Sequence, residues 1–301
     1  MDVSSTMLFN NSIFFKFLIL STLVCLSLCS LKETDCNCKV NSGGDNLKIV
    51  NGTQYVTNKY PWLVSLQVER SNGKYVHTCG GSLINEQWIV TAAHCGYMNL
   101  TRLSVSVGAH NITNSGKHYK VAQFIKHPGY TTTPIVRNDI ALIQLAEPID
   151  RFNKEAKPAC LTSRNIYFTS NELFVAGWGV TDEKEHKSTE VPLEVRMDHV
   201  NYLRCSLSWI GLLSYQSHIC AQASQSSPCF GDSGGPLMVV NGPGTMYLVG
   251  VVSFGSSCAG SSPTVFTRVT SYLDWIDQTT KSYCRIDNQD VNSLPRSEIE
   301  A

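Results

Sequence analysis

Three short segments of this sequence together hold the side chains of a serine-nucleophile relay. They are Thr91-Ala92-Ala93-His94-Cys95, Asn138-Asp139-Ile140-Ala141-Leu142 and Gly231-Asp232-Ser233-Gly234-Gly235-Pro236. A serine hydroxyl is a weak nucleophile at neutral pH, so an imidazole must accept its proton during attack and return it to the leaving group. The imidazolium that forms needs a fixed anion behind it. The sequence therefore predicts His94 as general base, Asp139 as its anion and Ser233 as nucleophile.

The glycines around Ser233 indicate how developing negative charge could be stabilised. A tetrahedral oxyanion needs backbone N–H donors that already point at it, and glycine lets the backbone turn outward without steric cost. We expect the amides of Gly231 and Ser233 to form an oxyanion hole. Taken singly, each segment also has an ordinary structural explanation: a core histidine, a turn residue that opens a strand, and a tight glycine turn.

The chain from Ile49 onward has the pattern of a β-protein that could hold these segments together. Short apolar or alternating runs follow one another with turn residues between them, which is typical of an all-β barrel or sandwich. The predicted strands cover residues 62–68, 103–107, 121–125, 140–145, 193–197, 237–240, 246–252 and 265–269.

One helix is predicted near the end of the chain, before a polar tail at 281–301. Tyr272, Trp275, Ile276 and Thr279 would share one face of this helix, and Ser271-x-x-Asp274 has the spacing of a capping box. The tail lacks periodicity, so we expect it to be disordered.

The N-terminal part of the chain predicts secretion and a propeptide. Residues 1–29 contain one cation, Lys16, followed by the apolar run 17–28, and we interpret them as a secretory signal peptide. An uncleaved membrane anchor is the alternative, because residues 13–28 approach the length of a spanning helix. Residues 30–48 are polar and glycine-rich, which predicts an exposed segment that a protease could reach.

Charge excludes some partner classes. The chain has 24 Lys and Arg residues against 24 Asp and Glu residues, with no block of either sign. Neither nucleic acid nor, once the signal is removed, a membrane surface would therefore be recognised by charge.

Ten cysteines remain beyond the signal region, an even set that predicts disulfides formed in an oxidising compartment. They are Cys36, Cys38, Cys79, Cys95, Cys160, Cys205, Cys220, Cys229, Cys258 and Cys284. Metal binding is the alternative for Cys36-x-Cys38, but no second Cys/His cluster with ligand spacing accompanies it. We expect no metal and no cofactor.

In their order along the chain and in their residues, the motifs resemble those of the trypsin and chymotrypsin family of secreted serine proteases. Beside the three segments above, the sequence has Gly-Trp-Gly at 177–179 and Ile-Val-Asn-Gly at 49–52 after a basic residue. The resemblance covers about residues 49–280. It implies two six-stranded antiparallel barrels with a cleft between them, a serine endopeptidase that works through an acyl-enzyme, and protein or peptide substrates. Protein protease inhibitors are the further partners implied, and we expect a monomer.

The resemblance also implies activation by proteolysis. The bond Lys48–Ile49 matches the family's activation site, and the new amino group of Ile49 would be buried against Asp232. A buried amine and carboxylate are stable only as a pair, so Asp232 would lack its partner before cleavage. We expect an upstream trypsin-like protease to make this cut.

The resemblance pairs the cysteines as 79–95, 205–220 and 229–258. A further bridge of many relatives is absent, because Leu173 and Val239 occupy both of its positions. We predict that Cys36 or Cys38 bridges Cys160 and that the other bonds Cys284, which would keep the propeptide tethered after activation.

The residues matching the family's substrate-binding cleft predict an apolar or small preferred side chain. Ser227 stands at the base of the pocket where trypsin-like enzymes carry Asp, and Gly255 and Thr264 form its walls. Phe266 makes the floor less polar still, and Pro228 and Phe230 are unusual neighbours. Ser253 would contact Asp139, and Ser253-Phe254-Gly255 would pair with the substrate backbone, with Phe254 replacing the usual Trp. The choice between chymotrypsin-like and elastase-like preference stays open.

Asn51, Asn99 and Asn111 lie in Asn-x-Thr sequons and are predicted glycan sites in a secreted protein. Residues 109–114 match the family's calcium loop but contain no acidic residue, so we predict no calcium. A protease-like binding protein that has lost catalysis is the rival interpretation. Such chains usually lose a member of the Ser-His-Asp set, and this one retains all three. A regulatory cascade protease would share the same chemistry and is not distinguished.

Overall fold

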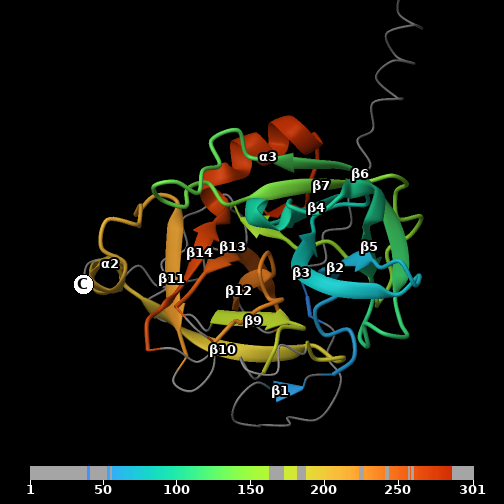
Figure 1. Ribbon diagram of the computed structural model, residues 1–301, viewed down its shortest axis with the longest axis horizontal. Coiled ribbons are helices and arrows are strands. Elements are labelled where there is room, and N and C mark those ends of the chain that lie inside the picture. The colour runs from blue at the N-terminus through green and yellow to red at the C-terminus, as the bar shows by residue number, and fades with distance from the viewer. Residues whose placement is uncertain are drawn as a thin grey trace, which may run out of the picture. The chain divides into compact units, whose positions relative to one another are not determined.

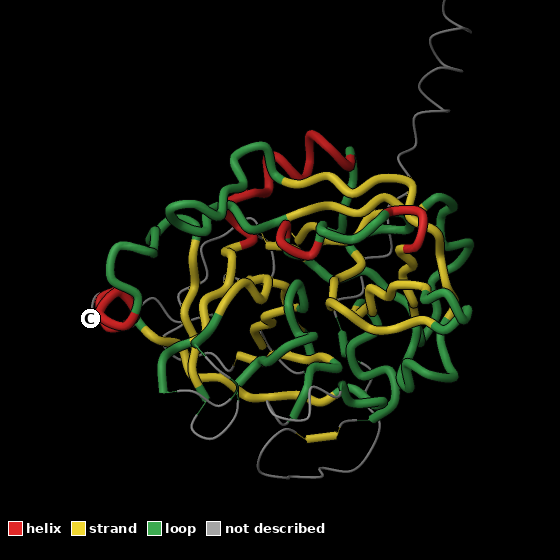
Figure 2. The backbone as a smooth tube through the Cα atoms, viewed as in Figure 1, coloured by secondary structure: helices red, strands yellow, loops and turns green. Residues whose placement is uncertain are grey.

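The computed structural model describes residues 39–40, 53–54, 56–162, 173–181, 188–223, 227–240, 244–256, 258 and 261–286. The chain divides into two units, residues 1–35 and 36–301, and all described residues belong to the second. Strands form most of this unit, and the helices are short (Figures 1 and 2). None of the described helices is long and apolar enough to cross a membrane.

Six antiparallel strands close the first barrel in the order β2-β3-β4-β7-β6-β5. They are β2 (Leu63–Glu69), β3 (Tyr75–Leu83), β4 (Trp88–Thr91), β5 (Leu103–Val107), β6 (Lys117–Lys126) and β7 (Ala141–Leu145). Side chains such as Leu66, Ile89 and Leu142 are fully buried inside it. Burial of this apolar surface is the main force that holds the barrel together.

The second barrel closes because β10 pairs with both β9 and β11, in the order β10-β11-β14-β13-β12-β9. Its strands are β9 (Leu173–Gly177), β10 (Leu193–Val200), β11 (His218–Gln222), β12 (Pro236–Val240), β13 (Met246–Phe254) and β14 (Thr264–Arg268). The short strand β1 (Thr53–Gln54) pairs with the start of β10, and β8 (Leu161–Thr162) pairs with β15 (Arg285–Ile286). The architecture is thus the two-barrel all-β fold that the resemblance implied.

Helical segments lie between or after the strands. They are the 3₁₀ turns η1 (Ala93–Cys95), η2 (Leu100–Arg102) and η3 (Val269–Tyr272) and the α-helices α2 (Tyr202–Ser208) and α3 (Leu273–Thr280). The sequence predicted α3 but not α2.

The predicted capping box of α3 is wrong. The helix begins after Tyr272, its N-cap residue, and no side chain caps it. Ser271 instead donates its hydroxyl to the carbonyl of Gln216. The buried face consists of Leu273, Ile276 and Thr280, because packing against the β core decides the orientation of the helix more than capping propensity does.

Every predicted strand is present with boundaries shifted by a few residues. The barrel strands β3, β4, β9 and β11 and the short strands β1, β8 and β15 were not predicted. Strand β3 contains Gly80 and Gly81, which resemble a turn in the sequence. In the barrel a Cβ atom at Gly81 would lie 2.9 Å from the Ile89 side chain and 3.1 Å from the Val64 side chain. This glycine therefore permits close packing within the barrel and forms no turn.

Three disulfides join six of the described cysteines in the implied pairs 79–95, 205–220 and 229–258. Where many relatives have a further bridge, Leu173 and Val239 are cross-strand partners and are fully buried. Apolar packing between β9 and β12 thus occupies the place of that disulfide.

Contacts between the two barrels place the predicted chemical groups at a common junction. The Trp62 indole nitrogen lies 3.2 Å from the Met238 sulfur. Thr267 of the second barrel donates its hydroxyl to the Asp139 carbonyl of the first at 2.8 Å. Hydrogen bonds as well as side-chain packing therefore hold the two barrels together at this junction.

Candidate active site

The Asp139 carboxylate lies at the barrel junction and is 1% exposed. Its Oδ1 accepts a hydrogen bond from the His94 amide at 2.9 Å, and its Oδ2 bonds His94 Nδ1 at 2.8 Å. The Ser253 hydroxyl donates to Oδ2 at 2.6 Å. Burial alone would raise the pKa of Asp139, but these hydrogen bonds outweigh it and lower the pKa below its ordinary value. The carboxylate is therefore held as an anion.

The turn before Asp139 is fixed by its neighbour. Asn138 has φ of 51°, in the left-handed region that Asn tolerates better than most residues. Its amide group donates to the Gly129 carbonyl at 2.7 Å, and Tyr272 donates its hydroxyl to the Asn138 side chain at 2.9 Å. These bonds orient the start of β7, so Asp139 points into the junction.

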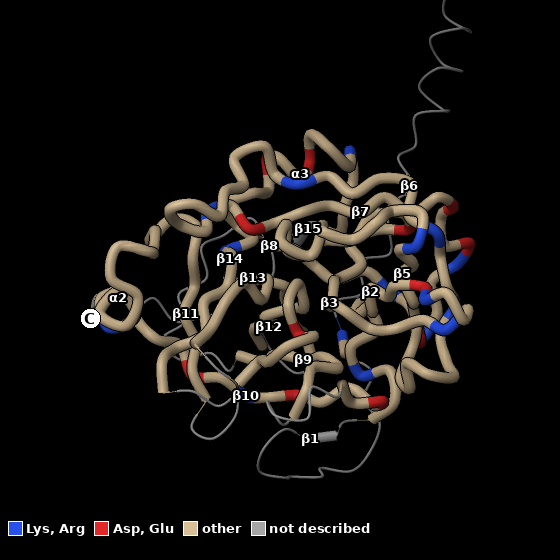
Figure 3. The backbone as a smooth tube through the Cα atoms, viewed as in Figure 1, with Lys and Arg blue, Asp and Glu red and all other residues tan. Residues whose placement is uncertain are grey.

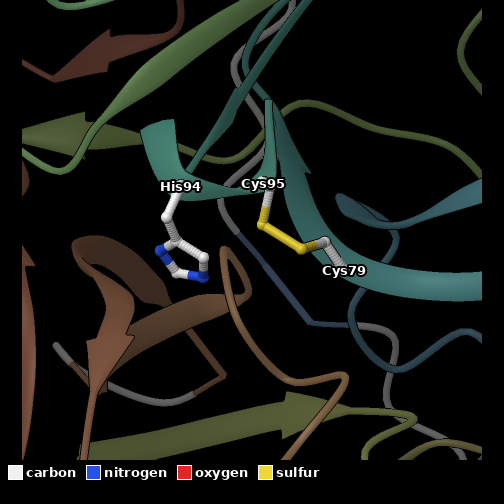
Figure 4. A group of neighbouring side chains, drawn as sticks. All are labelled: Cys79, His94 and Cys95. Carbon is white, nitrogen blue, oxygen red and sulfur yellow. A yellow bond between two sulfur atoms is a disulfide. The ribbon is translucent and has the colours of Figure 1, made fainter. Parts of the chain in front are cut away.

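His94 sits in η1, next to the Cys79–Cys95 disulfide that anchors this turn to β3 (Figure 4). The side chain is 30% exposed. Because Nδ1 faces the carboxylate, it carries the proton of the neutral ring, and Nε2 keeps the lone pair that a general base needs. Cys79, His94 and Cys95 have ligand atoms within 4.8 Å of one another, but the two sulfurs bond each other and are not thiolate ligands for a metal.

The turn that carries Ser233 is built on glycines and joined to the first barrel. Gly231 and Gly234 have φ of 100° and 79°, values that other residues rarely adopt. The Gly80 amide of β3 donates to the Ser233 carbonyl at 2.8 Å. A Cβ atom at Gly234 would lie 2.7 Å from the Gly80 carbonyl, so only glycine permits this approach.

Ser233 itself is partly exposed. In the described part of the chain its hydroxyl makes no hydrogen bond to His94, and the amides of Gly231 and Ser233 donate none. The structure thus brings the serine turn to the histidine side of the junction and leaves both amides available. Nucleophile–base hydrogen bonds are often loose in the absence of substrate.

Asp232 is a second carboxylate of the junction, with only backbone donors. The residue as a whole is partly exposed, but its carboxylate oxygens are packed against Gly177 and Gly179. Its oxygens accept from the Gly179 amide at 2.8 Å and the Cys229 amide at 2.9 Å. Among the described residues it has no cationic partner. Burial raises the pKa of Asp232 to about 6, although the two amides oppose this shift.

The Gly-Trp-Gly motif makes room for this carboxylate. Cβ atoms placed at Gly177 and Gly179 would clash with the Asp232 oxygens. Between the two glycines, Trp178 is fully buried and donates its indole N–H to the His110 carbonyl at 3.2 Å. Both glycines of the motif are therefore required by close approach.

His77 on β3 is a site residue that the sequence analysis missed. Its Nε2 bonds the Gly231 carbonyl at 2.9 Å and its Nδ1 bonds the Ser65 hydroxyl at 2.8 Å. Burial lowers the pKa of His77 to about 4, so the ring is neutral and donates from Nε2 to the carbonyl. His77 thereby fixes the residue that opens the serine turn. Its position two residues before Cys79 was the available signal.

The predicted cleft wall follows the end of β13. Ser253 is buried, and the Phe254 ring meets the Trp209 ring edge-on at 5.2 Å. A Cβ atom at Gly255 would lie 3.8 Å from the Thr264 hydroxyl, so these two residues face each other. Thr264 is 5% exposed and Phe266 is fully buried against its barrel core.

Other predicted residues near this wall occupy its surroundings. Ser227 and Pro228 are partly exposed, and Phe230 is 58% exposed. Cys229 is joined to Cys258. The structure thus brings Gly255 and Thr264 together at the ends of β13 and β14, while the place of Ser227 in a pocket stays a prediction from the resemblance.

Several predicted residues lie outside the described part of the chain: Cys36, Cys38, Lys48, Ile49 and Asn51. Cys160 and Cys284 are described, and both are disulfide-bonded to partners other than the six cysteines paired above.

The two sequons within the described residues form closed turns. Asn99 is exposed and Asn111 is partly exposed. Each side-chain carbonyl accepts hydrogen bonds from the amide and hydroxyl of the threonine two residues later.

A comparison with protein families agrees with this geometry. The family model described as Trypsin matches residues 49–276, which is most of the chain. The match spans both barrels and ends within α3.

We expect the free energy of unfolding of the intact chain to depend on Asp232. A carboxyl with a raised pKa in the folded state favours folding below its unfolded pKa, near 3.8, and this contribution is lost as the pH rises through about 6. Ionisation of Asp232 should therefore lower the free energy of unfolding by about 3 kcal/mol as the pH rises from 3.8 to about 6. Urea unfolding at pH 4, 5, 6 and 7 would measure the effect by comparison with Asp232→Asn.

Asp274→Asn is the matched control, because Asp274 is exposed on α3. It should keep the pH dependence of the unaltered chain. Equal pH dependence in the Asp232→Asn chain would contradict the prediction.

Proposed function

The chain belongs to the trypsin family of proteases, and on that premise we propose that it is a secreted serine endopeptidase made as a zymogen. His94, Asp139 and Ser233 would be its catalytic residues. The single observation that carries this proposal is the buried Asp139 carboxylate, bonded to both the amide and Nδ1 of His94 and to Ser253. A barrel core does not need a buried anion that holds an imidazole in one tautomer in order to be stable, so this arrangement points to catalysis.

In the proposed reaction, Ser233 Oγ attacks the carbonyl carbon of the scissile peptide bond while its proton passes to His94 Nε2. Asp139 stabilises the imidazolium. His94 then returns the proton to the leaving nitrogen, the carbon–nitrogen bond breaks, and an acyl-enzyme remains on Ser233. Water, deprotonated by the same imidazole, releases the carboxylic product and restores the serine.

The negative charge on the carbonyl oxygen would be met by the amides of Gly231 and Ser233. Their availability in the described structure supports this role. Donors fixed before the reaction cost no reorganisation when the charge develops, and such donors typically supply a large part of catalysis. The bond from His77 to the Gly231 carbonyl supports the orientation of this peptide.

Activation would supply the cation that Asp232 lacks. We propose that a trypsin-like protease cuts after Lys48 and that the amino group of Ile49 then pairs with the Asp232 carboxylate. The raised pKa of Asp232 in the intact chain supports this order of events, because a buried carboxylate without a cation is costly. The adjacent turn that carries Ser233 would adopt its active conformation once the pair forms.

The proposed substrate preference is an apolar or small side chain before the scissile bond. Ser227 carries no charge to pair with Lys or Arg, and the Thr264 hydroxyl faces Gly255 where a long side chain would pass. The enzyme should therefore not cut efficiently after Lys48 of its own zymogen, which supports a separate activator. Protein inhibitors of serine proteases would be its other partners, and it would act as a monomer without metal or cofactor.

Cleavage of the purified chain after Lys48, followed by profiling on a peptide library, tests the function. We expect hydrolysis after apolar residues, abolished in Ser233→Ala but with unchanged folding, because the acyl-enzyme cannot form without the hydroxyl. Hydrolysis after Lys or Arg would overturn the interpretation of Ser227. No hydrolysis by the correctly activated chain would favour a protease-like binding protein.

Thr264→Gly should widen the pocket toward larger side chains. Removing the side chain that faces Gly255 should raise the ratio of kcat/KM for phenylalanine over alanine substrates by roughly 10–200-fold. Thr132→Gly, in an exposed loop, is the control and should leave the ratio unaltered. A ratio that stays the same in Thr264→Gly would exclude Thr264 as a wall of the pocket.

The propeptide 30–48 should remain attached after activation, through Cys36 and Cys38 bonded to Cys160 and Cys284. Non-reducing electrophoresis of the cleaved protein should show one species and reducing electrophoresis two. A propeptide released without reductant would show that the bonding partners of Cys160 and Cys284 lie elsewhere.

A further inference from the structure

An exposed apolar knob projects from α2 and the loop that follows it. The knob consists of Tyr202, Leu203, Leu207, Ile210 and Tyr215, whose exposed fractions are 38, 73, 71, 81 and 66%. Five of the ten large hydrophobic residues exposed in the described chain are thus found within fourteen positions. Side chains this exposed protrude into solvent and do not line a groove. Figure 1 shows α2 at the left edge of the molecule, beyond β11.

The knob is held rigidly. The Cys205–Cys220 disulfide ties α2 to β11, and the Asn201 side chain caps the helix by accepting from the Arg204 amide at 2.9 Å. After the helix, Trp209 donates its indole N–H to the Pro263 carbonyl at 2.9 Å. A fixed apolar protrusion loses little conformational entropy when it binds, which favours an interaction role over an accidental exposure.

The charge around the knob favours a surface of lipid headgroups. Residues 199–231 contain no Asp or Glu, and Arg204 is their only Lys or Arg. In Figure 3 the α2 segment accordingly shows blue and no red. No carboxylate of this stretch would be repelled by phosphate, and the Arg204 guanidinium can pair with it. A second guanidinium, that of Arg268, lies 5.9 Å from the ring of Tyr215.

Two tyrosines lie at the base of the knob. Their rings, Tyr202 and Tyr215, meet edge-on at 5.6 Å, and Tyr202 donates its hydroxyl to the Leu213 carbonyl at 3.4 Å. Tyrosine has an apolar ring and a polar tip, and it is enriched where hydrocarbon meets water. The knob thus combines aliphatic side chains with two tyrosines, a residue type that membrane interfaces prefer.

The extent of the knob argues against a stable protein partner or a second copy of this chain. A fully covered aromatic side chain buries about 150–250 Å². Five side chains that begin partly covered would therefore not exceed the roughly 800 Å² per partner of a standard protein interface. A lipid surface requires no matching concave patch.

We propose that the knob inserts into the interfacial region of a lipid bilayer and docks the protein there reversibly. Three aliphatic side chains without a lipid anchor provide weak binding, comparable to other single membrane-binding signals. A net charge of zero had argued against electrostatic attraction to membranes, and docking through the knob relies on apolar insertion. This docking does not rest on the proposed enzymatic function.

Docking would nevertheless orient the candidate cleft. Trp209 lies between Leu207 and Ile210 in the chain, and its ring contacts Phe254 of the cleft wall. Insertion of the knob would hold that wall beside the lipid surface. In a point that does rest on the proposed protease function, proteins anchored in or near the bilayer would be the substrates presented to it.

Co-sedimentation with phosphatidylcholine vesicles, with and without phosphatidylserine, tests the docking. The chain should carry Ser233→Ala and be recovered from the medium of expressing cells, so that hydrolysis does not enter the measurement. We expect binding to both vesicle types, somewhat stronger with phosphatidylserine. The double variant Leu207→Ser and Ile210→Ser should lower the partition coefficient by on the order of tenfold or more.

Leu100→Ser is the matched control, because Leu100 is an exposed leucine of η2 in the first barrel. It should bind vesicles as the parent chain does. Equal binding by the double variant, or no binding by the parent, would overturn the proposal. So would a dimer in sedimentation velocity without lipid that the double variant converts to a monomer, because the knob would then bind a second copy.

Discussion

Two carboxylates buried at one barrel junction impose the main constraint on this protein. A carboxylate taken out of water must receive hydrogen bonds or a cation, or its pKa rises until it is neutral. Asp139 receives three donors, two of them from His94, and its pKa is lowered. Asp232 receives two backbone amides, and its pKa is raised to about 6. Desolvation raises the pKa of both carboxylates, and the stronger set of donors around Asp139 reverses that shift while the two amides at Asp232 do not.

Many of the surrounding residues make room for these two carboxylates or orient the peptides beside them. Gly177 and Gly179 have no side chain because the Asp232 oxygens occupy that space, and His77 holds the peptide beside it through the Gly231 carbonyl. None of the described strands belongs to both barrels, and hydrogen bonds such as that from the Gly80 amide to the Ser233 carbonyl join them. Positioning by rigid strands on both sides keeps a candidate site more constrained than flexible loops could.

The fold tolerates departures from its family's pattern where packing can compensate. Leu173 and Val239 fill the place of a disulfide with buried apolar contact between neighbouring strands. Phe254 stands where a larger aromatic residue is usual, and the Trp209 ring packs edge-on against it. Trp209 and Phe254 both pack against the small cluster around Cys205 and Cys220, so the predicted cleft wall and the base of the loop after α2 share a core.

The sequence by itself predicted an all-β barrel or sandwich and eight of its strands, because apolar alternation between turn residues is a local signal. The resemblance of its short motifs to a known family supplied the choice of two barrels, and the roles of the chemical groups stay predictions. It missed β3, whose Gly80 and Gly81 imitate a turn, and it assigned α3 a cap that Ser271 does not provide. It also missed His77, because the one local signal, its place two residues before Cys79, does not show that the ring bonds Gly231, which lies far away in the chain. Only the tertiary structure decided which donors reach Asp139 and Asp232, and that Leu203, Leu207 and Ile210 stay uncovered. Burial and hydrogen bonding depend on residues far apart in the chain, and no local pattern encodes them.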